Sequence, residues 1–282
     1  MIEGPITLTL RCGRFRLPLD RPLVMGVVNV TPDSFYDGGR YADPGAAVQH
    51  ARRLIEEGAD LLDIGGESSR PGAAAVDAEE ELRRVLPVLE SLLGVGVPVA
   101  VDTTKPEVMR AALDRGAAMI NDISALAVPG ALANVAGTDA AVCLMHMQGS
   151  PRTMQANPVY VDVVAEVRDF LSARAQACVD AGVARDRIVV DPGFGFGKTV
   201  EHNLALLGHL DAIAALGYPV LAGWSRKSSL GRITGKPGEE RLAASVAAAL
   251  LAVQRGARIV RVHDVAATRD ALAVLAALES MP

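Results

Sequence analysis

The chain has 282 residues, of which 50% are apolar, 22% are charged and 4% are aromatic, and its formal net charge is −5. These values exclude a mainly disordered, collagen-like or disulfide-rich protein. An acidic chain with few aromatic side chains is also not expected to bind nucleic acid. The length fits two average domains, or one barrel of alternating strands and helices, which takes about 250 residues.

The first 20 residues contain the stretch TLTLRCGRFRLPL, which predicts a short β-hairpin. After it, short runs rich in valine and isoleucine alternate with longer helical patterns. Most of these runs are continuously apolar, as is typical of parallel strands that are buried on both faces. The eight predicted strands cover residues 23–30, 61–64, 97–101, 119–123, 141–145, 188–190, 220–222 and 259–262.

Helices are predicted in the gaps between these strands. Asp43 and Asp77 each precede a helical pattern and are suited to cap it. Pro44 and Pro106 suit the first position of a helix, where proline loses no hydrogen bond. Longer helical patterns cover residues 159–181, 239–254 and 266–279.

The repeated order of strand and helix predicts an α/β protein with a single (β/α)8 barrel and a short N-terminal hairpin. We expect one domain overall, in which residues 1–20 form a hairpin that packs on a barrel of residues 21–282. A doubly wound open sheet is the alternative. The first turn between strand and helix, NVTPDSFYDGGR, lacks the GxGxxG pattern, which argues against the dinucleotide-binding form of that sheet.

The sequence contains no signal for a membrane or an oxidising compartment. The longest uncharged apolar run, residues 242–253, is shorter than the roughly 20 residues that a bilayer requires. The first residues lack the basic start and long apolar stretch of a signal peptide. Cys12, Cys143 and Cys178 are far apart and predict free thiols. We therefore expect a cytoplasmic protein without a membrane partner.

Polar side chains interrupt or follow every predicted strand. In a barrel of this kind, the carboxyl ends of the strands form the active site. A single polar residue there is often only a helix cap or a turn residue, but burial of many polar groups is costly unless they are paired or serve a site. The residues at these positions are Asn29, Asp63, Asp102, Asn121, Asp122, His146, Asp191, Ser225, Arg226, Lys227, Arg261, His263 and Asp264.

The chemistry of these groups divides the predicted site into two parts. The carboxylates and the amide of Asp102, Asn121 and Asp191 suit a flat, nitrogen-rich heterocycle. The second part offers donors for a phosphate or diphosphate, from Asn29, Ser69, Arg70, Arg261 and His263. The sequence therefore predicts a pocket that takes both a ring and an anion.

Three loop-like stretches lie between the predicted elements. DPGFGFGKT, residues 191–199, fails the GxxxxGK[ST] spacing and predicts a glycine-rich loop that brings Phe196 close to a ligand. GGESSRPG, residues 65–72, is typical of a surface loop or of a loop that closes over substrate. In SRKSSLG, residues 225–231, Lys227 is a solvated turn residue, an electrostatic ligand or a Schiff-base nucleophile.

A tightly held zinc ion is not expected. His50, His202 and His209 lack the spacing of a metal site, and the sequence has no HExxH motif and no Cys/His cluster. Magnesium remains open, because it often binds mainly to substrate phosphates and water.

Several stretches resemble the dihydropteroate synthase family of the folate pathway. They are MGVVNVTPDSFYDGG, DIGGESSRPGA, VDTTKPEV, INDI, CLMHMQG, DPGFGFGK, SRKS and RVHDV, in order from residue 25 to residue 265. DIGGESSRPGA and DPGFGFGK are highly specific. The resemblance implies a Mg²⁺-dependent transferase with a (β/α)8 barrel, commonly a homodimer. Its substrates are 6-hydroxymethyl-7,8-dihydropterin diphosphate and 4-aminobenzoate, and its products are 7,8-dihydropteroate and diphosphate.

The resemblance also assigns roles to individual residues. It implies that the catalytic residues are Asp102, Lys227, Arg261 and His263. The implied pterin contacts are Asp102, Asn121, Ile123, Met145, Asp191 and Lys227. The implied diphosphate contacts are Asn29, Arg70, Arg261 and His263, with Asn29 near the metal. The implied 4-aminobenzoate pocket, which sulfonamides also occupy, comprises Ser69, Pro71, Phe196 and Ser228, and the first mobile loop carries Asp33 and Ser34.

These residues fit a reaction without a covalent enzyme nucleophile. Mg²⁺, arginine and histidine neutralise the departing diphosphate, and the arylamine then attacks the pterin methylene. Two positions depart from a common family pattern. Ser69 stands where threonine is frequent, which changes loop packing, and Trp224 adds bulk where a smaller side chain is common.

Three other functions remain open. A catalytically silent paralogue that binds pterin is the main alternative, although Arg70, Lys227 and Arg261 are all present. An aldolase would use Lys227 as a Schiff base, which borohydride trapping would detect. A pterin-binding methyltransferase with a corrinoid partner should lack the loop GGESSRPGA.

Overall fold

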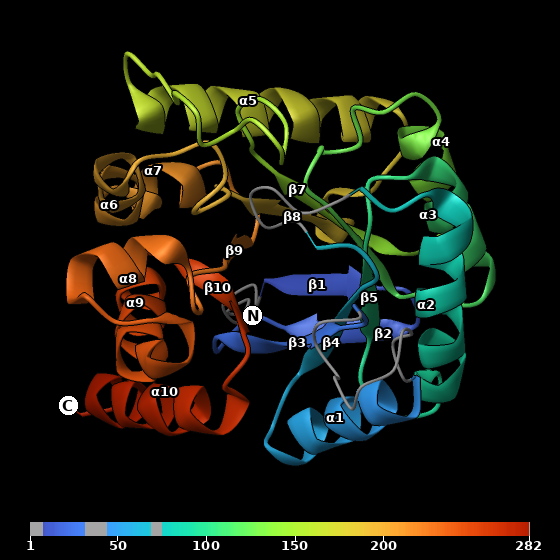
Figure 1. The fold of residues 1–282 in the computed structure, drawn as a ribbon, viewed down its shortest axis with the longest axis horizontal. Helices are drawn as coiled ribbons and strands as arrows, with labels where there is room; N and C mark the ends of the chain where they lie inside the picture. The colour runs from blue at the N-terminus through green and yellow to red at the C-terminus, as the bar shows by residue number, and fades with distance from the viewer. Residues whose placement is uncertain (1–7, 32–43, 69–74, 282) are drawn as a thin grey trace, which may run out of the picture.

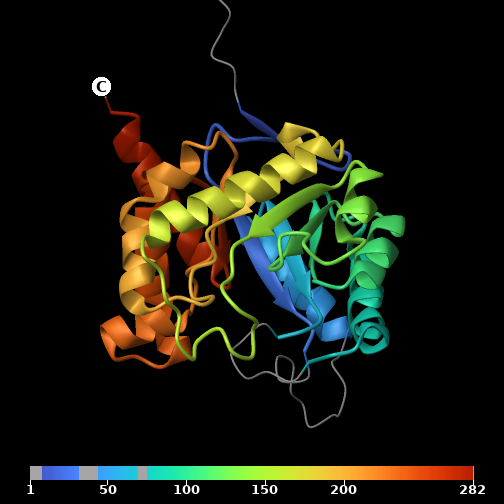
Figure 2. The ribbon, with the colours of Figure 1, turned by 90° about the horizontal axis from the view of Figure 1, so that it is seen from above.

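The computed structural model describes residues 8–31, 44–68 and 75–281. Within these ranges, eight parallel strands form a closed barrel in the order β10-β3-β4-β5-β6-β7-β8-β9. Helices surround the strands on the outside (Figure 1 and Figure 2). The predicted (β/α)8 barrel is therefore confirmed, and the open sheet is excluded.

The barrel strands agree closely with the apolar runs of the sequence. Nearly every strand residue is buried, because the helices cover one face and the barrel interior covers the other. The strands are β3 (Leu23–Asn29), β4 (Leu61–Gly65), β5 (Val99–Asp102), β6 (Met119–Asp122), β7 (Ala141–Met145), β8 (Ile188–Asp191), β9 (Val220–Ala222) and β10 (Ala257–Val262).

The helices follow the strands around the barrel. They are α1 (Pro44–Glu56), α2 (Ala78–Leu92), α3 (Pro106–Asp114), α4 (Ala131–Ala136), α5 (Val163–Asp180), α6 (Val200–Gly208), α7 (Leu210–Ala214), α8 (Ser228–Thr234), α9 (Leu242–Gln254) and α10 (Val265–Glu279). Short 3₁₀ helices, Arg185–Arg187 and Gly238–Arg241, precede β8 and α9. None of the helices in the described ranges is long and apolar enough to cross a membrane.

Capping side chains fix where two of these helices begin. Asp77 caps α2 as predicted, since its carboxylate accepts a hydrogen bond from the Glu80 amide at 2.8 Å. The helix predicted from residue 159 begins later, because Asp162 accepts bonds from the amides of Val164 and Ala165, both at 3.0 Å. Likewise, the first residues of the helix predicted over 239–254 form the 3₁₀ turn instead. The predicted cap Asp43 lies outside the described residues.

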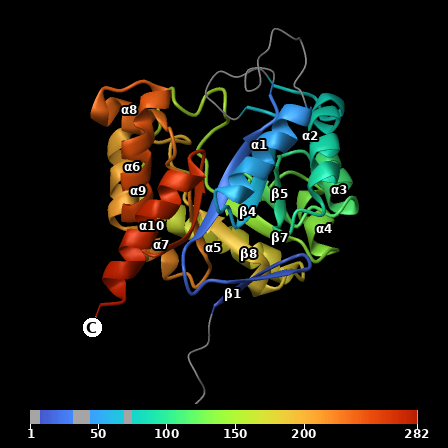
Figure 3. The same cartoon turned by 90° about the horizontal axis from the view of Figure 1, so that it is seen from below.

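The N-terminal hairpin closes one end of the barrel. Its strands, β1 (Thr9–Cys12) and β2 (Phe15–Pro18), pair antiparallel. Leu10 and Cys12 are buried in one cluster with apolar residues from the beginnings of the barrel strands. Figure 3 shows the hairpin lying across this end. The amino-terminal end of the barrel is therefore covered, which leaves the carboxyl end for a site.

The barrel interior changes from apolar to polar along its axis. The amino-terminal half is filled by a cluster that includes Leu23, Met25, Leu61, Ala100, Met119, Cys143, Val189, Leu221 and Ile259. Towards the carboxyl ends of the strands, inward positions carry Asp63, Asp102, Asn121, Asp191 and Arg261. The apolar half supports these polar groups from below and keeps water from that side.

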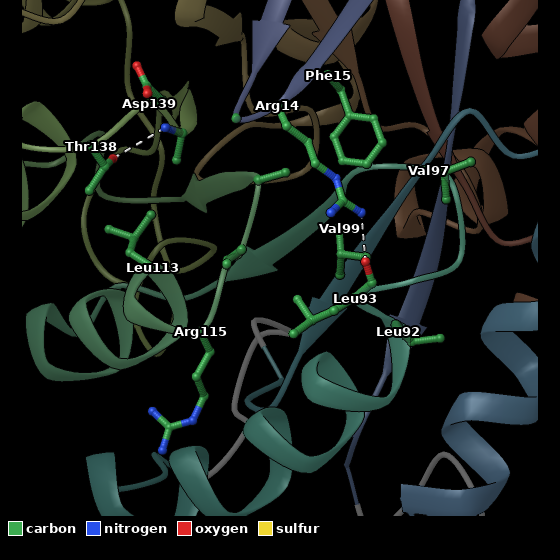
Figure 4. A pocket seen from close by; sticks show the side chains of 15 residues that line it. Arg14, Phe15, Leu92, Leu93, Val97, Val99, Leu113, Arg115, Thr138 and Asp139 are labelled. Carbon is green, nitrogen blue, oxygen red and sulfur yellow. Dashed lines mark hydrogen bonds between the residues drawn. The ribbon is translucent and has the colours of Figure 1, made fainter.

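A separate cavity of about 370 Å³ lies near the closed end (Figure 4). It is lined by the hairpin turn, the last residues of α2 and α3 and residues 138–140. Arg14 donates a hydrogen bond there to the Leu93 carbonyl at 2.8 Å, and its guanidinium lies 4.9 Å from the Phe15 ring centroid. Because this cavity lies near the amino-terminal ends of the strands, it is not the site that the sequence predicts.

Candidate functional site

A charged network crosses the barrel interior at the level of the polar strand ends. Arg261 on β10 donates from Nε to Oδ2 of Asp63 at 2.5 Å and from Nη2 to Oδ2 of Asp102 at 3.1 Å. Asn121 on β6 donates from Nδ2 to the same Asp63 oxygen at 3.0 Å. Four strands are thus joined through one guanidinium and two carboxylates, and charge-assisted bonds of this kind fix side-chain geometry well.

Burial makes the charges of this network sensitive to protonation. Burial and the neighbouring Asp63 charge together raise the pKa of Asp102 to about 7, although the charge of Arg261 opposes the shift. Burial alone would lower the pKa of Arg261, but the two carboxylates raise it, so the guanidinium remains charged. Asp63 is completely buried, and its Oδ1 atom has no hydrogen-bond partner within the described structure. The network therefore carries excess acceptor capacity near a single cation.

The strand register extends the site sideways from this network. Asn29 at the end of β3 aligns with Gly65, which aligns with Asp102, which in turn aligns with Asn121. A side chain at Gly65 would place its Cβ 3.7 Å from the Cβ of Asp102. Glycine at this position therefore leaves no side chain beside the carboxylate of Asp102.

An apolar wall stands beside the polar groups. Ile123, Met145, Met154 and Phe196 form one buried cluster. Met145 aligns in register with Asp191, so the wall adjoins a carboxylate. A buried apolar wall beside a carboxylate acceptor suits a heteroaromatic ring.

Asp191 lies between this wall and two lysines. Burial raises its pKa to about 6, while the Gly193 amide, which donates to Oδ1 at 2.7 Å, and the charges of Lys227 and Lys198 oppose the shift. The Lys227 ammonium lies 4.0 Å from the ring centroid of Phe196, a cation–π distance. Three residues that the sequence assigns to substrate contacts, Asp191, Phe196 and Lys227, therefore meet at one place.

His263 differs from the sequence-based expectation of a residue that neutralises charge. Burial, together with the charges of Arg261 and Arg226, lowers the pKa of His263 to about 3. Its Nδ1 atom lies 2.9 Å from Oγ of Ser225. A neutral imidazole contributes a hydrogen bond and not a full positive charge.

The structure places the remaining predicted residues less centrally or does not describe them. Ser228 is exposed at the first position of α8. The residues predicted on the two loops lie outside the described ranges, and they are Asp33, Ser34, Ser69, Arg70 and Pro71. Just beside the second loop, Glu67 accepts hydrogen bonds from the Val76 amide at 3.1 Å and from Lys105. One carboxylate thus joins the residues that flank this loop.

A comparison with known proteins matches this arrangement. A family model for pterin-binding enzymes covers residues 25–263. The chain is 53% identical over 275 residues to the dihydropteroate synthase of Neisseria meningitidis, with 95% of this chain and 96% of that protein aligned. The chain belongs to the dihydropteroate synthase family. The sequence-based prediction of the family is therefore confirmed. The predicted enzyme class, a transferase that makes 7,8-dihydropteroate, is confirmed as well.

Two solved structures agree with the family over nearly the whole chain. The Xanthomonas albilineans dihydropteroate synthase with 4-aminobenzoic acid has a TM-score of 0.93 and 57% identity, covering 98% of this chain and 100% of that one. The Burkholderia cenocepacia enzyme complexed with 7,8-dihydropteroate has a TM-score of 0.89 and 55% identity, covering 97% of each chain. The barrel is thus that of a dihydropteroate synthase along its full length.

Two residues of this dihydropteroate synthase site received no specific role from the sequence, although Asp63 stood among the polar strand positions. Asp63 was recognisable as a charge inside an apolar strand, but its bond to Arg261 joins residues 198 positions apart. Lys198 resembled the lysine of a phosphate loop, yet it is 2% exposed and surrounded by protein oxygens. The available signal for Asp63 was a charged residue inside an apolar strand, and the signal for Lys198 was the GKT end of the glycine-rich stretch.

Proposed function

We propose that the chain condenses 6-hydroxymethyl-7,8-dihydropterin diphosphate with 4-aminobenzoate by diphosphate departure followed by direct attack of the arylamine. The observation that carries this proposal is the polar layer of Asp102, Asn121, Asp191 and Arg261 beside a buried apolar wall. Relatives solved with 4-aminobenzoic acid and with 7,8-dihydropteroate support the choice of substrates. No covalent enzyme intermediate is part of the proposal.

The pterin ring lies deep in the barrel in this proposal. Asp102 and Asp191 accept hydrogen bonds from ring N–H groups, and the Asn121 amide can both donate and accept. Ile123 and Met145 cover the flat faces of the ring, since both belong to the buried apolar wall. Lys227 adds a positive charge at the rim, where it already lies over Phe196.

The diphosphate lies on the opposite side, near β3 and β10. Arg261 uses two of its N–H groups for Asp63 and Asp102, and a guanidinium has five such donors. The others are available to phosphate oxygens, together with His263, Asn29 and Arg70. Bidentate donors of this kind match the geometry of a phosphate group.

The described residues fit a Mg²⁺ ion that arrives with the diphosphate. No group of three or more His, Cys, Asp or Glu side chains within the described ranges could hold a metal ion. Asn29 offers one amide oxygen, and Mg²⁺ commonly takes one or two protein ligands plus phosphates and water. When bound, Mg²⁺ would neutralise charge on the leaving diphosphate.

The reaction then needs only positioned charges. The bond between the pterin methylene carbon and the diphosphate oxygen breaks, and its electron pair leaves with the diphosphate. The methylene carbon gains cationic character, which the pterin ring and the Asp102 carboxylate stabilise. The amine of 4-aminobenzoate attacks this carbon and loses a proton to solvent. In this proposal the arylamine pocket includes Phe196 and Ser228, and the family resemblance also assigns Ser69 and Pro71 to it.

A diphosphate-release assay tests this function. Purified protein with pterin diphosphate and Mg²⁺ is expected to release diphosphate and form dihydropteroate only when 4-aminobenzoate is present. Chelation of Mg²⁺ with excess EDTA should abolish turnover, and added Mg²⁺ should restore it. Binding of the pterin substrate without any arylamine-dependent product would contradict the proposal and favour the silent paralogue.

We also propose that the chain is a cytoplasmic homodimer. Large apolar side chains are exposed on neighbouring helices near the C-terminus, and they are Ile233, Leu242, Leu251, Val274 and Leu278. Exposed apolar surface of this kind supports association with a second copy. The buried free thiols support a reducing compartment. Light scattering should give twice the 29.4 kDa mass of one chain, and a mass of one chain would exclude the dimer.

A further inference from the structure

We infer that Lys198 is a positioning residue: its ammonium holds residues 192–197, here called the glycine loop, against the end of β7 and so places Phe196 and Lys227 for the arylamine. This inference rests on the proposed function for its consequence in catalysis. The contacts that Lys198 makes with the glycine loop, here called the clamp, can be measured without turnover.

The Lys198 ammonium is enclosed by protein acceptors. It donates to the carbonyls of Gly193 and Phe196, both at 3.0 Å, and to the carbonyl of His146 at 3.3 Å. Its Nζ also lies 3.0 Å from Nδ1 of His146. Lys198 is 2% exposed, and none of the ion pairs found in the described structure includes it. A lysine so enclosed does not reach substrate, which makes it a positioning residue and not a catalytic one.

The glycine loop needs such a central donor because its backbone packs directly on other backbone. Gly193 has φ 70° and Gly197 has φ 59°, a region that favours glycine. A Cβ atom would lie 1.9 Å from the His146 carbonyl oxygen at Gly193 and 2.5 Å from the Gln148 carbonyl oxygen at Gly197. The buried carbonyls face inward, away from water, and the ammonium satisfies them.

A second contact holds the far end of the glycine loop to the segment that precedes α5. The Tyr160 hydroxyl donates to the Gly197 carbonyl at 2.8 Å. The His146 ring lies 4.9 Å from the Phe170 ring and 6.1 Å from the Tyr160 ring, between centroids. His146 is therefore fixed by packing and gives Lys198 a rigid support. Burial lowers the pKa of His146 to about 3 and that of Lys198 to about 7.

The glycine loop contains the site residue Phe196 and contacts two others, Asp191 and Lys227. The Gly193 amide holds Asp191, and the Phe196 ring lies under the Lys227 ammonium. A Cβ atom at Gly195 would lie 3.2 Å from Cδ of Lys227, so the lysine stem runs along the glycine loop. A shift of the glycine loop therefore moves the ring, the cation and the carboxylate together.

Trp224 is an intrinsic fluorescent probe of how the glycine loop packs. Trp224, the single tryptophan in the sequence, is 2% exposed, and its ring centroid lies 4.7 Å from that of Phe194 in the glycine loop. Loosening the glycine loop exposes or repacks this indole. Quenching of Trp224 fluorescence by acrylamide thus measures how tightly the glycine loop is held, independently of catalysis.

The test compares Lys198→Met with Lys198→Gln and with a control variant, Leu92→Ala. Leu92 is a fully buried residue on α2, so the control should be destabilised without any change to a contact of the glycine loop. Lys198→Met keeps the stem but removes every donor, whereas the glutamine amide keeps two N–H donors. We expect Lys198→Met to raise the KM for 4-aminobenzoate by about tenfold or more, with a smaller change for the pterin substrate, and to increase Trp224 quenching. Lys198→Gln should recover part of both effects, and Leu92→Ala should show neither.

Unchanged quenching and unchanged KM in Lys198→Met would overturn the inference. Equal losses in Lys198→Met and Leu92→Ala would also overturn it, because they would indicate only lost stability. Should Lys198→Met fail to fold, the same criteria apply to Lys198→Gln. Failure of the proposed function would instead appear as a wild-type protein that lacks arylamine-dependent turnover, while the quenching comparison would still report on the clamp.

Discussion

Replacing Arg261 with methionine is expected to lower the free energy of unfolding by about 3–5 kcal/mol, because it leaves the buried carboxylates of Asp63 and Asp102 without their cation. The Asp63 side chain is fully buried, and those of Asp102 and Arg261 are at most one-fifth exposed, so solvent screens them little. Turnover should fall below detection, since the same guanidinium is proposed to hold the diphosphate. Thermal or urea unfolding measures the first effect, and diphosphate release measures the second.

The pH dependence of stability gives this variant a specific signature. Arg261 lowers the pKa of Asp102, so its removal raises that pKa above the present value of about 7. The folded variant then holds a proton that the unfolded chain, with its ordinary pKa of 3.8, releases. The wild type, with an Asp102 pKa of about 7, already gains stability as the pH falls from about 7 towards 4. In the variant this gain should begin at a higher pH, and it is lost as the pH rises through the raised pKa.

Two further variants separate charge from geometry. Arg261→Lys keeps the cation but loses the fork that reaches two carboxylates, so we expect intermediate stability and poor turnover. Adding Asp63→Asn to Arg261→Met removes one uncompensated charge and should restore part of the stability. An Arg261→Met protein as stable as the wild type at neutral pH would show that the network does not depend on this cation.

The barrel was predictable from the sequence, whereas the contacts inside it were not. Strands buried on both faces appear as continuous apolar runs, so 141–145 and 220–222 were identified with the same bounds as β7 and β9. The start of the helix predicted from residue 159 was placed too early. Capping by Asp162 fixes the start of α5 at Val163, although the apolar pattern begins before it. Short helices such as α7 offer too few turns for a periodic pattern.

Site residues were predictable where the fold alone brings them together. Carboxyl ends of barrel strands meet, so Asp102 and Asn121 were expected to be neighbours, and they align in register. The bond between Arg261 and Asp63 depends on which rotamers fill the interior, which no local pattern encodes. The low pKa of His263 likewise follows from burial beside two arginines, a property that only the assembled barrel has.

Replacing Lys227 with alanine is expected to weaken binding of the pterin substrate by about 10- to 100-fold, the range for a lost charged contact of roughly 1.5–3 kcal/mol. The ammonium now lies over the Phe196 ring and near Asp191, so its loss removes a cation from the junction of all three. Lys227→Arg should retain most of the affinity, because a guanidinium also stacks on an aromatic face. Titration calorimetry with the pterin substrate measures both variants.

The same lysine sets the pH range over which the ring carboxylate is ionised. The charge of Lys227 lowers the pKa of Asp191, which burial has raised to about 6. Without that charge the pKa rises, and a protonated Asp191 no longer accepts two hydrogen bonds from the ring. Pterin affinity in Lys227→Ala should therefore begin to fall at a higher pH than in the wild type as the solution is acidified. Parallel affinity profiles for the two proteins would mean that Lys227 contributes a contact to the substrate but does not control the ionisation of Asp191.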